Sequence, residues 1–131
     1  MNLLLDTQAL VWWHEGHRKL GPRARKAIET HATRVHVSIA SVWEIAIKVR
    51  RGLLRLREPC HVWLHAAIDT SGFQVLAVAV DHAVDFASLP DHHPDPFDRM
   101  LIVQARAEGL TIVTSDTAFD DYDVKVLDAR A

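Results

Sequence analysis

The stretch from Asp95 to Asp116 constrains the fold most strongly, because it joins one helix directly to one buried strand. The helix is predicted to begin after Asp95, which suits an N-cap, and to end at Gly109. Residues 110–113 are apolar and partly β-branched, which indicates a buried strand that a right-handed crossover sets parallel to an earlier one. Asp116 follows closely, so we expect it at the carboxyl edge of the sheet, where ligands bind in open α/β folds.

The rest of the chain alternates between short strands and helices in the same way. Further strands are predicted over residues 2–5, 35–38, 73–80 and 124–127, and further helices over residues 7–13, 22–32, 39–51, 59–69 and 81–88. No hairpin signal such as Asn-Gly interrupts this order. The alternation predicts an α/β fold, a three-layer α/β/α domain with a mainly parallel central sheet. We expect residues 1–131 to form a single domain, since no segment has the composition of a linker.

Composition narrows the possible functions. A net charge of −2 excludes a broadly cationic nucleic-acid binder but leaves room for basic patches beside an acidic pocket. Cys60 is the only cysteine, so an intramolecular disulfide cannot form. The first residues lack the basic region and long apolar segment of a secretion signal. We therefore expect a cytoplasmic protein that does not enter a membrane.

Four carboxylates stand where a parallel sheet could bring them to one edge: Asp6, Glu44, Asp98 and Asp116. Carboxylates that lie close repel each other, and such a cluster stays ionised only if a cation lies within it. Oxygen ligands without cysteine or an essential histidine select a hard ion, Mg²⁺ or Mn²⁺. An ion of this kind suits phosphodiester hydrolysis. Four neighbours could support the carboxylates or contact phosphate from outside the ligand set: Thr7, Thr114, Ser115 and Arg99.

A purely structural explanation of these acids stays open, because Asp commonly caps helices and ends strands. Glu44 favours the metal site, since a carboxylate among apolar neighbours is costly unless it is paired or binds an ion. Its competing explanation is an ordinary (i, i+4) pair with Lys48.

Several segments together resemble a known family: LLLDTQALVWW, SIASVWEIAIKVRRGLL, DPFDRMLIVQARAEGLTIVTSD, and the closing Phe119, Tyr122 and Val126-Leu127. They look like a PIN-domain protein of the VapC toxin type, and the resemblance spans nearly the whole chain in the expected order. It implies a metal-dependent endoribonuclease that acts as the toxin of a type II toxin–antitoxin pair. It also implies an RNA substrate, cleavage to 3′-hydroxyl and 5′-phosphate ends, a cognate antitoxin as partner, and a homodimer.

By position, the family's acidic metal-binding set falls on the same four residues, Asp6, Glu44, Asp98 and Asp116. The resemblance makes Asp6 and Asp98 the direct ligands, with the other two completing the pocket directly or through water. Gln8 departs from the histidine often found after the Asp-Thr pair in similar sequences. Three further acids are interpreted as caps or surface residues: Asp95, Asp120 and Asp121.

Two basic clusters could follow an RNA backbone, although charged runs are often simply solvated. The first follows the predicted helix that carries Glu44 and consists of Lys48, Arg50, Arg51, Arg55 and Arg57. The second consists of Arg18, Lys19, Arg23, Arg25 and Lys26. Proximity to the acidic residues favours the first.

The remaining candidates are histidines and tryptophans. His61 and His65 are spaced to share a helix face, but HVWLH lacks the glutamate of a zinc-peptidase motif and has no third ligand, which disfavours zinc. His92 and His93 are expected to be exposed in a loop that could gate the site. The tryptophans are expected in the core, and any that is exposed would instead suggest a protein-binding groove: Trp12, Trp13, Trp43 and Trp63.

Three other functions were weighed against the toxin. A housekeeping RNA-processing nuclease of the PIN type would share the same chemistry, and a catalytically silent PIN module would bind RNA or protein without turnover. A phosphatase of the haloacid-dehalogenase kind needs a second Asp two positions after Asp6, where Gln8 stands. That last function is therefore disfavoured.

Overall fold

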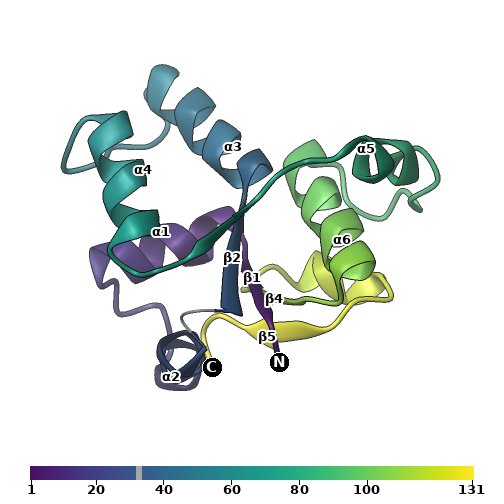
Figure 1. Cartoon of the computed structure of the whole chain (residues 1–131), viewed down its shortest axis with the longest axis horizontal. Helices are drawn as coiled ribbons and strands as arrows, with labels where there is room; N and C mark the ends of the chain where they lie inside the picture. The colour runs from purple at the N-terminus through teal and green to yellow at the C-terminus, as the bar shows by residue number, and fades with distance from the viewer. Residues whose placement is uncertain (32–33) are drawn as a thin grey trace.

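The computed structural model describes residues 1–31 and 34–131 and builds them around a central sheet (Figure 1). Its strands are β1 (Leu3–Leu5), β2 (Val35–Ser38), β3 (Gln74–Leu76), β4 (Thr111–Thr114) and β5 (Val126–Asp128). Their spatial order is β3-β2-β1-β4-β5, and every neighbouring pair runs parallel. The predicted mainly parallel sheet is confirmed.

Helices cover both faces of this sheet and complete three layers (Figure 1). They are α1 (Thr7–Glu15), α2 (Pro22–Thr30), α3 (Ile39–Arg50), α4 (Cys60–Asp69), α5 (Val80–Phe86) and α6 (Pro96–Glu108). Helices α1, α2 and α4 lie on one side, and α5 and α6 lie on the other. Helix α3 contacts α1 and α4 as well as α6, so it joins the two helical layers beyond the end of β2.

The central strands β1 and β4 are fully buried, because helices cover both faces of the sheet there. In β1, Leu3 and Leu5 pack into the core cluster that contains Trp63 of α4. Leu4 points the opposite way and packs with Phe119 and the buried face of α6. Alternating side chains of one short strand thus serve two separate cores.

The direction in which successive strands are added to the sheet reverses at β1. The chain builds outward from β1 to β2 and β3, then returns to place β4 on the other side of β1. The two central strands end together, with Leu5 opposite Val113 and the N–H of Asp6 donating to the carbonyl of Val113 at 3.1 Å. Such a reversal leaves a crevice beyond the carboxyl ends of the strands, which is where open parallel sheets bind ligands.

Some predicted boundaries were wrong. The strand predicted over residues 73–80 is confined to β3, an edge strand that pairs only with β2. Helix α5 begins at Val80 rather than after Asp81, because the Nδ1 of His82 accepts the N–H of Ala79 at 2.9 Å and caps the helix there. The predicted end of the second helix at residue 32 falls outside the described residues. No helix in the described part of the chain is both long and apolar enough to span a bilayer.

Candidate active site

A pocket of about 380 Å³ lies beyond the carboxyl ends of β1 and β4. Its lining includes five carboxylates: Asp6, Glu44, Asp95, Asp98 and Asp116. The four acids predicted from the sequence are therefore brought together from two helices, α3 and α6, and from the ends of two strands, β1 and β4. Among the described residues that line the pocket, Lys48 supplies the one lysine or arginine side chain. The pocket consequently carries an excess of negative charge.

Asp6 lies on the floor of the pocket, where β1 passes into α1. Its Oδ1 accepts the N–H of Ala9 at 2.7 Å, so the same side chain caps α1. Burial raises the pKa of Asp6 to about 6, opposed by hydrogen bonds from Thr114 and Ala9 and reinforced by the charges of Glu44 and Asp116. Loss of hydration thus disfavours the ionised form of Asp6 near neutral pH.

Glu44 projects from α3 and is only 5% exposed. The hydroxyl of Thr7 donates to its Oε1, and the ammonium of Lys48 lies 2.8 Å from its Oε2. Burial lowers the pKa of Lys48, but the hydrogen bond and charge of Glu44 outweigh this effect and raise it. The alternative (i, i+4) pair is therefore present, and the burial of Glu44 does not by itself require a metal ion.

Asp98 occupies the first turn of α6 and has the most perturbed carboxyl in the pocket. The Oδ1 of Asp95 accepts the N–H groups of Phe97 and Asp98, which confirms Asp95 as the N-cap. Burial, followed by the charges of Asp95, Asp6 and the other carboxylates, raises the pKa of Asp98 to about 8. The metal-free pocket is thus poorly suited to an ionised Asp98, and a bound cation would remove this penalty.

Asp116 follows β4 and caps the 3₁₀ helix η2 (Thr117–Asp121). The N–H of Ala118 donates to its Oδ1 at 2.9 Å, and its own N–H donates to the Thr114 hydroxyl at 3.0 Å. Partial burial raises the pKa of Asp116, but hydrogen bonds from Ala118 and His93 outweigh it and hold the pKa below its usual value. The surroundings therefore favour the ionised form of Asp116 and disfavour that of Asp98.

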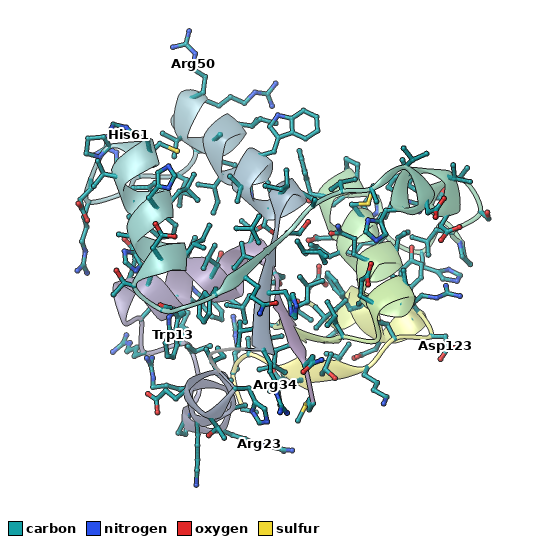
Figure 2. The ribbon with its side chains drawn as sticks, viewed as in Figure 1. Trp13, Arg23, Arg34, Arg50, His61 and Asp123 are labelled. Atoms are coloured by element: carbon teal, nitrogen blue, oxygen red, sulfur yellow. The ribbon has the colours of Figure 1, made fainter. Side chains whose placement is uncertain are left out.

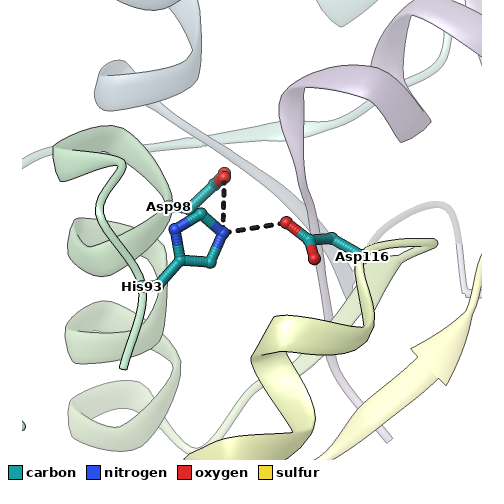
Figure 3. A group of neighbouring side chains, drawn as sticks. All are labelled: His93, Asp98 and Asp116. Carbon is teal, nitrogen blue, oxygen red and sulfur yellow. Dashed lines mark hydrogen bonds and ion pairs between the residues drawn. The ribbon is translucent and has the colours of Figure 1, made fainter. Parts of the chain in front are cut away.

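His93 is the residue at this site that sequence reasoning missed. The sequence predicted an exposed loop histidine, but His93 is 7% exposed, whereas His92 lies at the surface as expected. Its Nε2 lies 2.8 Å from Oδ2 of Asp116 and 3.3 Å from Oδ2 of Asp98 (Figure 3). In the sequence, the only indication that His93 belongs to the site was its position five residues before Asp98, in the run DHHPDPFD.

Tyr122 and Arg99 hold the loop that delivers His93. The Tyr122 hydroxyl accepts the N–H groups of His92 and His93, each at 2.9 Å, and donates to the Pro90 carbonyl at 2.7 Å. The Arg99 guanidinium donates to Asp91 at 2.9 Å and to loop carbonyls, including that of His93. Arg99 thus contacts the loop rather than the carboxylates it was predicted to steady.

The four basic residues predicted to contact RNA do not all lie beside the acidic pocket. Lys48 lines the acidic pocket, and Lys48 and Arg51 also line an adjoining depression of about 340 Å³. Arg50 projects outward from the end of α3 (Figure 2), and Arg55 is exposed in the segment after it. Ser115 lines the acidic pocket as well. Contact with RNA stays a prediction for all four basic residues.

Trp43 corrects the prediction that every tryptophan is in the core. Trp12 and Trp63 are buried, but Trp43 is 63% exposed and packs edge-on against Phe97 with ring centroids 5.4 Å apart. Trp43 forms one wall of an apolar groove of about 460 Å³ between α3, α5 and α6.

His61 and His65 have no third ligating side chain within the described residues, so the disfavoured zinc site gains no support.

The fold recurs in known proteins. The family model described as "PIN domain" matches residues 3–125. No curated protein sequence matches the chain significantly. The solved structures that share the fold include three that match over nearly the full length of both chains. VapBC2 from Rickettsia felis, bound to a DNA fragment from its promoter, has 17% identity and a TM-score of 0.74, covering 97% of this chain and 98% of that one.

The second is FitAcB from Neisseria gonorrhoeae, with 21% identity and a TM-score of 0.69, covering 97% of each chain. The third is a toxin–antitoxin complex from Klebsiella pneumoniae, with 18% identity and a TM-score of 0.68, covering 98% of each chain. At these identities the likeness shows a shared fold.

Proposed function

Because the chain belongs to the PIN domain family, we propose that it is a metal-dependent endoribonuclease that uses Mg²⁺, for which Mn²⁺ can substitute. The observation that carries this proposal is the convergence of five carboxylates with one lysine in a single pocket. Asp98, with a pKa raised to about 8, is the member that most needs a cation. A carboxyl whose pKa is raised this far by burial and by neighbouring charges is typical of a functional site.

The side chains present fit a hard divalent ion. The donors that converge are carboxylate oxygens, which Mg²⁺ and Mn²⁺ prefer. Asp6 and Asp98 would hold the ion directly, and Glu44 and Asp116 would complete the site directly or through water. When bound, the ion would supply Lewis acidity toward the scissile phosphate and offset the charge of these acids.

Other side chains hold Glu44 in place or add positive charge beside the pocket. Thr7 and Lys48 hold the two oxygens of Glu44, so this carboxylate cannot swing freely. Lys48 and Arg51 line the depression next to the pocket and would attract the RNA backbone. Attack of water on phosphorus, with departure of the 3′ oxygen, would leave 3′-hydroxyl and 5′-phosphate ends.

Asp98→Asn tests the enzyme directly. It removes one predicted ligand charge, so we expect loss of Mg²⁺- or Mn²⁺-dependent RNA cleavage, by about 100-fold or more if the residue binds the ion. The matched control is Asp123→Asn, which makes the same chemical change on an exposed side chain (labelled in Figure 2) that is not among the residues lining the pocket. Full metal-dependent cleavage by Asp98→Asn would show that the assigned chemistry is wrong. No metal-dependent cleavage by the unmodified protein would favour a silent binding module.

We further propose that the nuclease is the toxin of a type II toxin–antitoxin pair and acts in the cytoplasm. The fold it shares with a toxin–antitoxin complex supports this role. Induced expression should arrest cell growth, and co-expression of the small protein encoded next to it should restore growth. A protein that cleaves RNA in vitro but leaves growth unchanged would instead be a housekeeping RNA-processing nuclease.

The apolar groove beside Trp43 supports a protein partner. Large exposed apolar patches mark interaction surfaces, and this groove adjoins the depression that leads into the acidic pocket. We assign it to an apolar segment of the antitoxin, which could cross the groove and present a cationic residue to the carboxylates. A homodimer is also proposed from the resemblance to VapC toxins, and sedimentation velocity would test it.

A further inference from the structure

We propose that His93 is a positioning residue whose Nε2–H fixes the carboxylates of Asp116 and Asp98 for cation binding, while the imidazole stays outside the ligand set. The inference rests on the proposed function, because it concerns the same pocket. A histidine with two carboxylates at 2.8 and 3.3 Å could also be a third ligand. The hydrogen bond at its other ring nitrogen decides between these roles.

The Nδ1 of His93 faces a hydrogen-bond donor. The backbone N–H of Asp95 points at it from 3.1 Å, so Nδ1 accepts and carries no proton. The ring proton therefore lies on Nε2, which donates to Oδ2 of Asp116. A histidine that binds a metal through Nε2 needs that atom free of its proton and normally donates its Nδ1–H to an acceptor. Here the Asp95 N–H stands where that acceptor would have to be.

The imidazole cannot easily turn away from this arrangement. Its ring packs edge-on against Phe119, with centroids 5.6 Å apart and planes at 78°. Tyr122 accepts the backbone N–H of His93, and Arg99 donates to its carbonyl. Backbone and ring are thus held from several sides, and the direction of Nε2–H is set by the surrounding fold rather than by a flexible loop.

This fixed donor matters most for Asp116, whose side chain is 43% exposed. With Ala118 N–H on Oδ1 and His93 Nε2–H on Oδ2, both carboxylate oxygens have a protein donor. Each oxygen keeps a second lone pair for a cation or an ordered water. His93 therefore limits rotation of an otherwise mobile carboxylate, and Asp98, whose Oδ2 is also near Nε2, is held toward the same point.

Two substitutions separate the possible roles. His93→Gln keeps an amide N–H close to the position of Nε2, whereas His93→Leu keeps bulk but removes the donor. We expect calorimetric titration with Mn²⁺ to show affinity reduced by about 10- to 100-fold in His93→Leu and largely retained in His93→Gln. The ratio of Mn²⁺ to Mg²⁺ affinity should stay unchanged in both. A His93→Gln protein as impaired as His93→Leu, or with an altered ratio, would make the imidazole a ligand.

A measurement on the unmodified protein does not depend on any variant folding. Long-range ¹H–¹⁵N correlation spectra report the tautomer of His93, and we expect Nε2–H both without metal and with saturating Mg²⁺. A switch to Nδ1–H when Mg²⁺ is added would overturn the proposal.

The outcomes also separate this inference from the function on which it rests. If the unmodified protein binds neither Mn²⁺ nor Mg²⁺, the metal-dependent function fails and the role of His93 falls with it. If the unmodified protein binds Mn²⁺, Asp98→Asn does not, and His93→Leu binds normally, then the function stands and only the role of His93 is wrong.

Discussion

Asp98→Asn should stabilise the metal-free protein, although it removes a residue that the proposed function requires. The Asp98 side chain is 18% exposed and lies among four other carboxylates in the pocket. Burial and these charges raise its pKa to about 8 from the usual 3.8. An asparagine has nearly the same shape but carries no charge, so it removes this conflict while retaining the packing.

The pKa shift sets the sign and the size of the effect. In the unfolded chain Asp98 loses its proton above pH 3.8, but in the folded protein it does so only above about pH 8. Its contribution to stability is therefore complete below pH 4 and is lost as the pH rises to 8. At pH 7 this corresponds to about 4 kcal/mol. Because asparagine still has a polar group to bury, we expect a gain of about 2 kcal/mol.

Urea denaturation followed by circular dichroism would measure this gain. In EDTA, wild-type protein should become less stable between pH 5 and pH 8, whereas Asp98→Asn should show a flatter dependence and be more stable at pH 7. Added Mn²⁺ should reverse the order, because it stabilises only the protein that binds it. Asp123→Asn should follow the wild type throughout.

Two results would contradict this expectation. If Asp98→Asn is less stable than wild type at pH 7 in EDTA, or loses stability just as steeply with rising pH, then Asp98 is not under electrostatic strain. The pocket would then have no special need for a cation, and the main support for metal binding would be gone.

Three other changes probe the surroundings of the pocket. Tyr122→Phe leaves two loop N–H groups without their acceptor, so urea denaturation should show the free energy of unfolding lowered by about 1–3 kcal/mol. An unchanged free energy of unfolding would mean that water replaces the hydroxyl. Lys48→Ala removes the cation paired with buried Glu44, so we expect thermal melts in EDTA to show the protein less stable by about 1–2 kcal/mol. Mn²⁺ should restore part of this stability, and an equal loss with and without Mn²⁺ would contradict the expectation. Trp43→Ala should weaken antitoxin binding by about 10-fold or more in calorimetry; a shift in the monomer–dimer equilibrium with unchanged antitoxin affinity would assign the groove to a second copy of the chain.

The placement of the acids could be predicted where local patterns determine it. Asp6 and Asp116 directly follow short apolar runs, and such runs become buried parallel strands whose ends meet at one edge. Asp95 was predictable as a cap because Pro96 and a closing glycine mark both ends of α6. The pair between Glu44 and Lys48 was foreseeable too, since it follows from helical spacing.

The features that were missed depend on contacts between distant segments. The loop backbone at His93 is held by the hydroxyl of Tyr122, which lies 29 positions further along the chain. Trp43 follows the apolar spacing of α3, but that helix is apolar on more than one side, and periodicity does not show which side meets the sheet. Neither outcome can be obtained from neighbouring residues alone.

The neighbouring positions of β1 and β4 in the sheet also bear on how the protein is made. One catalytic candidate, Asp6, follows β1, whereas its partner Asp116 follows β4, a strand that is made much later than β1 but pairs with it. Pairing of these strands is a long-range event, and contacts of this kind are slow to form because they close a long loop. The acidic pocket therefore cannot exist on a partly synthesised chain. The proposed nuclease would therefore stay inactive until β4 has been made and has paired with β1.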